Sequence, residues 1–267
     1  MFIKKITNAT SLSDMLQSTL FKVEKRPLYM VNNSGIQERV NHEALVKADD
    51  GDILYIGKQY TPIENKTIVD AISKLPMDIV KINNYNNRVF EYNLVGNQNF
   101  KFGEEPAKFM MRIVNSYDGS KALRVDAGVY VLVCSNGAVS KKHGFNFGRK
   151  HTVGLGENEI AGFIEDSTNK MDGIINLFQN KTWHNNQEQG MQQFNELVKI
   201  FPESKTGEVH PMIEGINSRA ERYSEKYDIE FSLFMAATDF STHKERFGLS
   251  SSYARKLDSQ ISDVFMN

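Results

Sequence analysis

The chain has little of what marks secreted or membrane proteins. Cys134 is the single cysteine among 267 residues, so no internal disulfide can form and a reducing compartment is expected. The longest apolar run, Val129–Cys134, is six residues, whereas a membrane-spanning helix needs roughly 20. The first residues contain no apolar stretch of signal-peptide length. We therefore predict a cytoplasmic protein that does not associate with membranes.

The chain also lacks an excess of charge of either sign. Its 32 Lys and Arg residues nearly balance its 33 Asp and Glu residues, giving a formal net charge of -1. This balance excludes attraction to DNA through overall charge, so any nucleic-acid site requires locally clustered cations. The six histidines form no HxxxH or Cys–His pair, and we predict neither a metal site nor a cofactor.

What is present predicts an α+β fold. Four segments before residue 76 have helix or strand patterns: Ser11–Val23 (helix), Leu28–Asn33 and Ile53–Gly57 (strands), and Pro62–Leu75 (amphipathic helix). In the last of these, Thr61 is suited to the N-cap and Glu64 can complete a capping box. Pro76 then ends the helix.

From Val89 onward the hydrophobic period is two, which predicts strands. Five strand segments follow: VFEYNLV and NFKF, separated by a turn at Gly96-Asn97-Gln98, then Phe109–Val114, Ala122–Val125 and the apolar, buried Val129–Cys134. After Leu155 the pattern is helical, with one helix from Ile160 to Phe178, one from Met191 to Phe201 and two within Ile213–Phe247. We predict an antiparallel β-meander of about four to five strands packed with helices, and a helical C-terminal region. The expected divisions are a lead-in (1–59), an α+β core (60–180) and a helical part (181–267).

The densest positive charge lies in SKKHGFNFGRKHT, from Ser140 to Thr152. It carries four cations and two histidines that can add charge at lower pH: Lys141, Lys142, Arg149, Lys150, His143 and His151. No acid occurs between Asp126 and Glu157. Phe145 and Phe147 alternate with small residues, and Lys121 and Arg124 can extend the basic surface. Cations that hold phosphates beside stacking aromatic rings, with Tyr117 a more distant candidate, suit single-stranded nucleic acid. The alternative is a solvated basic hairpin that its two Phe side chains anchor to the core.

Other candidate residues have simpler structural interpretations. Asp118 can be an acid or metal ligand, but Asp118-Gly119 is also ordinary turn chemistry. A nucleophilic set of Cys134, His151 and Asp118 or Asp126 is conceivable, yet Cys134 closes an apolar strand and suits burial. Asp239 and His243 suit surface pairing on a helix. We therefore predict no catalytic residue and no enzymatic activity.

Five dispersed motifs carry a family resemblance. They are Tyr60–Ile72 (YTPIENKTIVDAI), Val114–Val125 (VNSYDGSKALRV), Val131–Gly137 (VLVCSNG), Arg149–Thr152 (RKHT) and Leu233–His243 (LFMAATDFSTH). Together they resemble the phage/plasmid-like protein family, domain-of-unknown-function family 932, over most of the chain. There are departures: Tyr130 and Leu132 stand where that family usually has Arg, and Gly137 where it has Thr. If that Arg serves the family's activity, this member is altered.

The resemblance implies a phage or mobile-element origin and a role inside an infected bacterium. The order of helix, β-meander and helices is also similar to the core of single-strand annealing proteins. We therefore expect a phage-encoded DNA-binding protein that binds or anneals single strands in recombination or replication, and a homo-oligomer is one assembly in which it can act. The alternative is an accessory protein that binds a host or phage protein, or a phosphorylated ligand, to counter defence. A nuclease or other hydrolase using Asp118, Asp126 and His151 ranks last.

Overall fold

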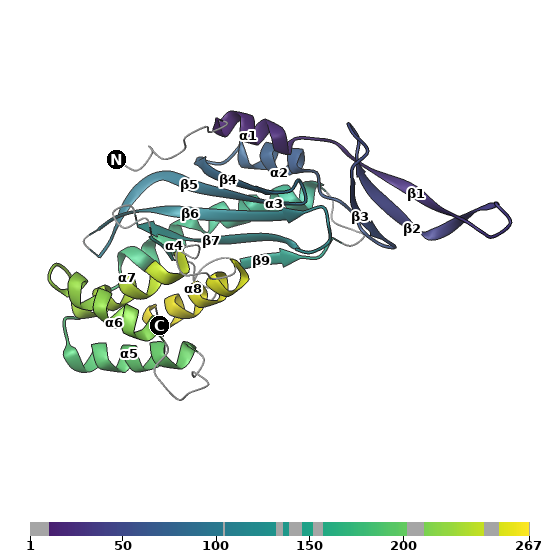
Figure 1. The fold of residues 1–267 in the computed structure, drawn as a ribbon. Helices are drawn as coiled ribbons and strands as arrows, with labels where there is room; N and C mark the ends of the chain where they lie inside the picture. Colours follow the sequence, from purple (N-terminus) through teal and green to yellow (C-terminus); the bar gives the residue numbers. More distant parts are fainter. Residues whose placement is uncertain are drawn as a thin grey trace. The chain divides into compact units, whose positions relative to one another are not determined.

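The fold is α+β, as predicted (Figure 1). The computed structural model describes residues 11–103, 105–131, 136–138, 146–151, 157–201, 211–242 and 251–266. The chain forms two compact units. Unit 1 comprises residues 1–94, 112–125 and 147–168, and unit 2 comprises residues 95–111, 126–146 and 169–267. Each unit is thus built from segments that are far apart in the sequence.

Unit 1 begins with α1 (Leu12–Thr19), whose first turn forms a capping box. The Ser11 hydroxyl accepts a hydrogen bond from the Asp14 N–H, and the Asp14 carboxylate accepts one from the Ser11 N–H, both at 3.1 Å. The predicted start is confirmed. The helix ends before Val23, where the prediction placed its end, because Leu20 leaves helical geometry and Val23 already belongs to a strand.

A three-stranded antiparallel sheet follows in the order β1 (Val23–Val31), β2 (Gln37–Lys47) and β3 (Ile53–Gly57). The prediction for β3 is confirmed, whereas β2 has too many charged residues to be recognised from apolar alternation. The base of the β1–β2 hairpin is buried through Ala44–Val46. The other end exposes four large apolar side chains: Tyr29, Met30, Val31 and Ile36.

Helix α2 (Asn65–Ile72) is shorter than predicted. Its N-cap is Glu64 in an extended conformation, with no side-chain capping bond, so the capping box predicted at Thr61 and Glu64 is wrong. The residues before the helix are extended because tertiary hydrogen bonds use their backbone. The Thr61 N–H donates to the His151 carbonyl (3.4 Å), and the Ile63 carbonyl accepts from the Asn115 side chain (2.9 Å).

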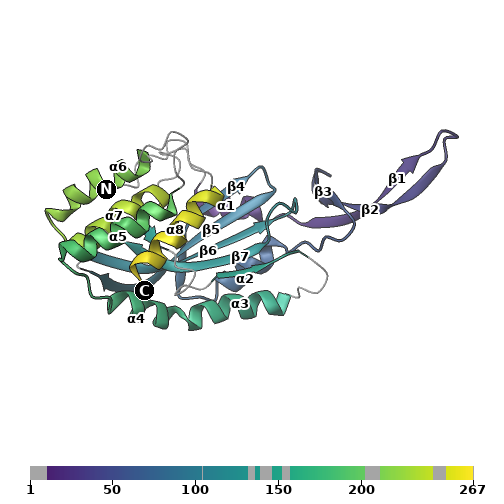
Figure 2. The same ribbon diagram turned by 90° about the horizontal axis from the view of Figure 1, so that it is seen from below.

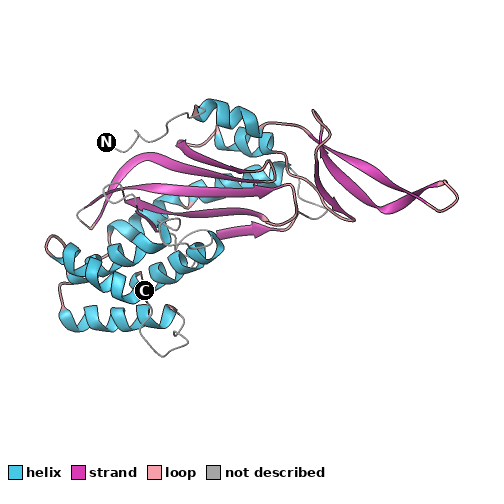
Figure 3. Ribbon diagram, viewed as in Figure 1, coloured by secondary structure: helices cyan, strands magenta, loops and turns pink. Residues whose placement is uncertain are grey.

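The larger sheet is the predicted meander (Figure 3). Its strands lie in the order β4 (Met77–Tyr85), β5 (Val89–Phe102), β6 (Glu105–Ser116), β7 (Leu123–Val131) and β8 (Asn136–Ala138), and β9 (Asn146–Arg149) also pairs with β7. The links from β4 through β7 are too short for parallel crossovers, so these neighbours run antiparallel. Residues 132–134, the end of the predicted central strand, lie outside the described residues.

The turn predicted at Gly96-Asn97-Gln98 is wrong, because β5 runs through it as one strand. Gly96 faces β6 instead of turning the chain. A Cβ built on Gly96 would lie 3.5 Å from the Cβ of Phe109, which is ordinary packing distance. Phe100 and Phe102 beyond it remain buried. Continued pairing with β6 and this burial keep the strand extended.

Helices complete both units (Figure 2). They are α3 (Glu157–Asn169), α4 (Met171–Gln179), α5 (Gln187–Ile200), α6 (Pro211–Ser224), α7 (Ile229–Thr242) and α8 (Ser251–Phe265). The single helix predicted from Ile160 to Phe178 is two helices, broken at Lys170 after the weak helix formers Ser167-Thr168-Asn169. The two helices predicted within Ile213–Phe247 are confirmed as α6 and α7. The sequence analysis did not identify α8.

An aromatic cluster forms the core of unit 2. The Phe102 ring lies 5.1–5.6 Å, centroid to centroid, from four others: Phe178, Trp183, Phe231 and Phe234. Most of these pairs are edge-to-face, the arrangement that aromatic quadrupoles favour. The aromatic residues at the start of α7 therefore pack in the core and do not form a ligand surface.

Candidate functional site

The structure describes part of the predicted basic segment. Lys141, Lys142 and Phe145 lie outside the described residues. The backbone of Phe147 and Arg149 belongs to β9, and Lys150 directly after it is exposed. Lys121, in the turn between β6 and β7, is exposed, and Arg124 on β7 is half-buried.

Pairing of β9 with β7 brings two separate basic stretches side by side. A Cβ built on Gly148 would lie 4.0 Å from the Leu123 carbonyl oxygen, so β9 runs close to the start of β7. The Arg149-Lys150 backbone therefore lies along the segment that carries Arg124. We call the residues Lys121, Arg124, Arg149 and Lys150 the basic strand pair.

The turn before this strand pair has the predicted chemistry. The Asp118 carboxylate accepts a hydrogen bond from the Ser120 N–H at 2.9 Å, and Gly119 adopts a positive φ of 71°. A Cβ on Gly119 would also meet the Tyr55 ring at 2.8 Å, so glycine is required here for two reasons. The turn role predicted for Asp118-Gly119 is confirmed. Asp118 lies three positions before Lys121 in the sequence.

His151 does not contribute to the basic surface, contrary to our prediction. Its side chain is buried, with its ring centroid 5.0 Å from that of Tyr60. Neither ring nitrogen has a hydrogen-bond partner among the described residues. Burial lowers the pKa of His151 below 6.5, although the Thr61 backbone beside the ring acts in the opposite direction. The imidazole is therefore neutral at pH 7.

This burial predicts a pH-dependent stability. A histidine in the unfolded chain has a pKa near 6.5, so below that pH the unfolded state binds more protons than the folded state. Stability due to His151 is therefore complete above pH 6.5 and decreases as the pH falls towards the folded-state pKa. We expect His151→Phe, which retains a ring against Tyr60, to remove this slope.

Urea unfolding between pH 5 and 8 measures the effect. The difference in slope cannot exceed about 1.4 kcal/mol per pH unit for a single group. His42→Gln is the matched control, because His42 is exposed, and it should leave the slope unchanged. An identical slope in wild type and His151→Phe would contradict the neutral, buried state of His151.

Tyr117 is also unavailable for stacking with bases. It is fully buried, and its ring packs on Phe21 and Phe90 at centroid distances of 5.4 and 5.6 Å. Its hydroxyl accepts a hydrogen bond from the Asn65 N–H at 2.8 Å. Tyr117 is thus part of the core of unit 1.

The sequence analysis missed a buried polar network in unit 1. The Asn115 side-chain amide donates to the Ile63 carbonyl at 2.9 Å and to the Asn65 side-chain oxygen at 2.8 Å. Asn65 in turn donates to the Thr19 carbonyl at 3.1 Å. Asn65, Asn115 and Thr19 are all fully buried. An Asn directly after the apolar pair Ile113-Val114 is a sequence signal for such a network, but the sequence does not identify its partners.

Two further hydrogen bonds connect the segment before α2 to the chain near Lys121 and Lys150. The Tyr60 hydroxyl donates to the Ser116 carbonyl, just before the turn that carries Lys121. The Thr61 N–H donates to the carbonyl of His151, which directly follows Lys150. Three dispersed motifs, YTPIEN, VNSYDGS and RKHT, therefore meet at one place. Their common role in the structure is to hold together the segments that carry the cations.

Comparison with known proteins places this region in a family. The description "Domain of unknown function (DUF932)" matches residues 55–262, which is most of the chain. The chain belongs to the DUF932 family. No curated protein and no solved structure matches it at a significant level. The DUF932 match includes the basic strand pair and every network residue except Thr19, whereas α1, β1 and β2 precede it.

The residues considered for catalysis in this DUF932 member have structural roles or lie outside the described part. Asp118 shapes a turn, Asp126 is buried, and Cys134 lies outside the described residues. Asp239 pairs with Arg219 at 2.8 Å, and His243 is not described. Across the described residues, no group of three or more His, Cys, Asp or Glu side chains is placed to hold a metal ion. In the same residues, no helix combines the length and apolar character needed to span a membrane.

Proposed function

We propose that this protein binds single-stranded nucleic acid through the basic strand pair and acts in recombination or replication of a phage or plasmid. The observation that carries the proposal is the pairing of β9 with β7. This pairing places Arg149 and Lys150 along the strand that follows Lys121. Lys121 and Lys150 are exposed, so their ammonium groups are accessible to phosphates.

Local charge supports this assignment in a protein of nearly zero net charge. The stretch between Asp126 and Glu157 has no acid, and Asp126 itself is buried. A polyanion would therefore be attracted to this stretch and not to the surface as a whole. Contacts of this kind are to the phosphate backbone, which makes binding tolerant of sequence and strongly dependent on salt. Base stacking by Phe145 and Phe147 remains a prediction.

The test is a fluorescence-anisotropy titration of labelled single- and double-stranded DNA at several salt concentrations. The variant replaces Lys121, Arg124, Arg149 and Lys150 by Ala. Each lost phosphate contact should reduce the slope of log K against log salt by about 0.7, so we expect a reduction of about 3 and at least a tenfold weaker Kd. A single-strand annealing assay with the same two proteins tests the recombination role.

A matched control removes the same charge elsewhere on unit 1. Lys22, Lys66, Lys74 and Lys81 are all exposed, and their fourfold Ala variant should bind as wild type does. Equal loss in both variants would indicate nonspecific attraction and contradict the site. Absence of binding by wild type at low salt would overturn the proposal and favour a protein or phosphorylated ligand as the target, which is the second hypothesis.

A further inference from the structure

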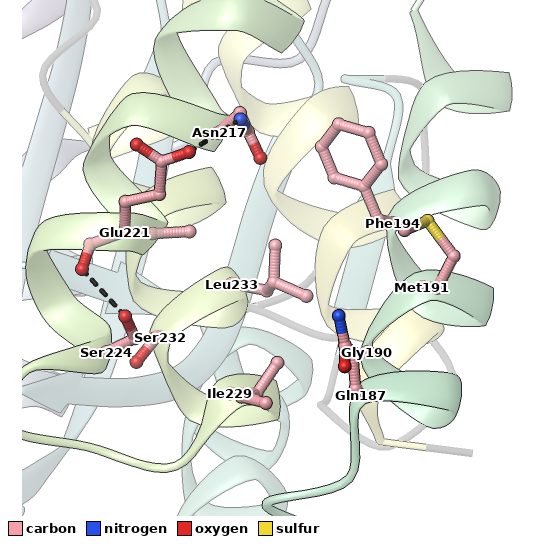
Figure 4. A pocket seen from close by; sticks show the side chains of 11 residues that line it. Gln187, Gly190, Met191, Phe194, Asn217, Glu221, Ser224, Ile229, Ser232 and Leu233 are labelled. Carbon is pink, nitrogen blue, oxygen red and sulfur yellow. Dashed lines mark hydrogen bonds between the residues drawn. The ribbon is translucent and has the colours of Figure 1, made fainter.

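Unit 2 contains a cavity of about 340 Å³ between α5, α6 and α7 (Figure 4). Helices α5 and α6 both pack against α7, so α7 forms the floor of the cavity and the other two form its walls. One face of α5 and one face of α6 line the cavity, each with residues at the i, i+3, i+4, i+7 spacing of a helix. These residues run from Gln187 to Phe194 on α5 and from Asn217 to Ser224 on α6.

Small and apolar side chains shape the cavity. Gly190 is buried, and a Cβ built on it would lie 2.5 Å from the Cγ2 of Ile229, so α5 can approach α7 this closely only with glycine. Met191, Phe194 and Leu233 are among the apolar side chains that line it (Figure 4). Met191 is 56% exposed, although it belongs to this apolar lining. An apolar ligand would cover it and gain burial.

Polar groups enter the cavity mainly from α6. The Asn217 side chain donates to the Glu221 carboxylate at 3.1 Å, and the Ser224 hydroxyl donates to the Glu221 carbonyl at 2.7 Å. The hydrogen bond from Asn217 uses one carboxylate oxygen of Glu221, and the other carboxylate oxygen takes no part in it. Among the described residues that line the cavity, Glu221 is the only one with a formal charge. This composition disfavours an anionic ligand. The ligand would lose hydration on binding, and no positively charged side chain among the described residues lines the cavity to compensate for that cost.

We propose that this cavity binds a small amphiphilic cation, namely an apolar or aromatic body that carries an amine. The body lies against Met191, Phe194 and Leu233, and the ammonium group donates to the Glu221 carboxylate. The lining of α5 spans about 10 Å at 1.5 Å per residue, which matches a bicyclic aromatic ring with a short side chain. The volume is at the lower end of the range for small-molecule sites. This site is independent of the proposed nucleic-acid surface. Its lining disfavours anions, and a ligand that carries phosphate is an anion.

The experiment uses three matched probes: 2-naphthylmethylamine, 2-naphthalenemethanol and 2-naphthoate. Binding is followed through the 13C-methyl resonances of the methionines, with the Met191 signal assigned by Met191→Leu. We expect the amine to shift the Met191 methyl signal and the naphthoate to leave it unchanged. Glu221→Gln should weaken amine binding about tenfold and leave the weaker binding of the alcohol unaltered.

Two further variants locate the site, and a third provides the control. Ala220→Phe fills the cavity and should abolish amine binding. Because Ala220 is buried, Ser224→Phe at an exposed lining position repeats the test with little risk to folding. Glu225→Gln removes an exposed acid of the same region that does not line the cavity, and it should bind the amine as wild type does. Equal binding of amine and naphthoate, no shift of Met191 with any probe, or full binding by both filled variants would overturn the proposal.

Discussion

Replacing Glu230 by alanine is expected to lower the free energy of unfolding of unit 2 by about 3–5 kcal/mol. Glu230 is buried in the first turn of α7, and its carboxylate accepts hydrogen bonds from three groups. They are the Lys181 ammonium (3.0 Å), the His184 N–H (2.9 Å) and the Gln193 side-chain amide. Without the carboxylate, a largely buried ammonium loses its counter-charge and a backbone N–H loses its acceptor.

Urea unfolding followed by tryptophan fluorescence measures this loss. Trp183 is the only tryptophan of the chain, and it lies in the aromatic cluster of unit 2, so it reports on that unit. Glu225→Ala removes an exposed acid nearby and should change stability by no more than about 0.5 kcal/mol. A loss below 1 kcal/mol for Glu230→Ala would mean that these three contacts do not hold the segment 181–184 to α7.

Asn115→Asp should destabilise unit 1 by about 3 kcal/mol at pH 7, although it changes a single atom type. Asn115 donates through one nitrogen to the Ile63 carbonyl and the Asn65 side-chain oxygen. A carboxylate at this buried position would place a negative charge against two acceptors and could donate to neither. Urea unfolding followed by circular dichroism gives the free energy.

The pH dependence distinguishes this cause from a general loss of packing. Burial raises the pKa of the introduced carboxyl group, so its penalty is largest above the folded-state pKa. The penalty should shrink as the pH falls, because the protonated group can donate one of the two lost bonds. Asn41→Asp, at an exposed position of β2, is the control and should be nearly neutral at every pH. A deficit for Asn115→Asp that does not change with pH would contradict the hydrogen-bonding role.

Local signals in the sequence predicted several elements correctly. The helix start at Ser11 and the turn at Asp118-Gly119 depend on residues within three positions of each other, so both can be predicted from spacing alone. The alternation after Val89 likewise predicted the meander, because each strand shows its own period of two. It was wrong in dividing β5 and β7 into two strands each. The helical spacing of apolar residues predicted α6 and α7, because this spacing is a local property of each helix.

Long-range contacts explain the predictions that were wrong. The pattern around Thr61 and Pro62 is a good helix start, but the backbone there bonds to His151 and Asn115, which are more than 50 positions away. Gly96 resembles a turn residue, and only pairing with β6 shows that it lies within a strand. Local propensity is worth tenths of a kcal/mol per residue, which tertiary hydrogen bonds and burial easily exceed.

The sequence by itself determined the fold class, the family resemblance and the presence of a basic stretch free of acids. Only the tertiary structure decided which of those residues can meet a ligand. It pairs β9 with β7 and so joins Arg149 and Lys150 to the segment of Lys121, while it buries His151 and Tyr117 in the core of unit 1. Charge and aromatic character belong to each residue, whereas exposure depends on strands and helices that are distant in sequence. That dependence is why the basic surface could be proposed from the sequence but its members could be selected only from the fold.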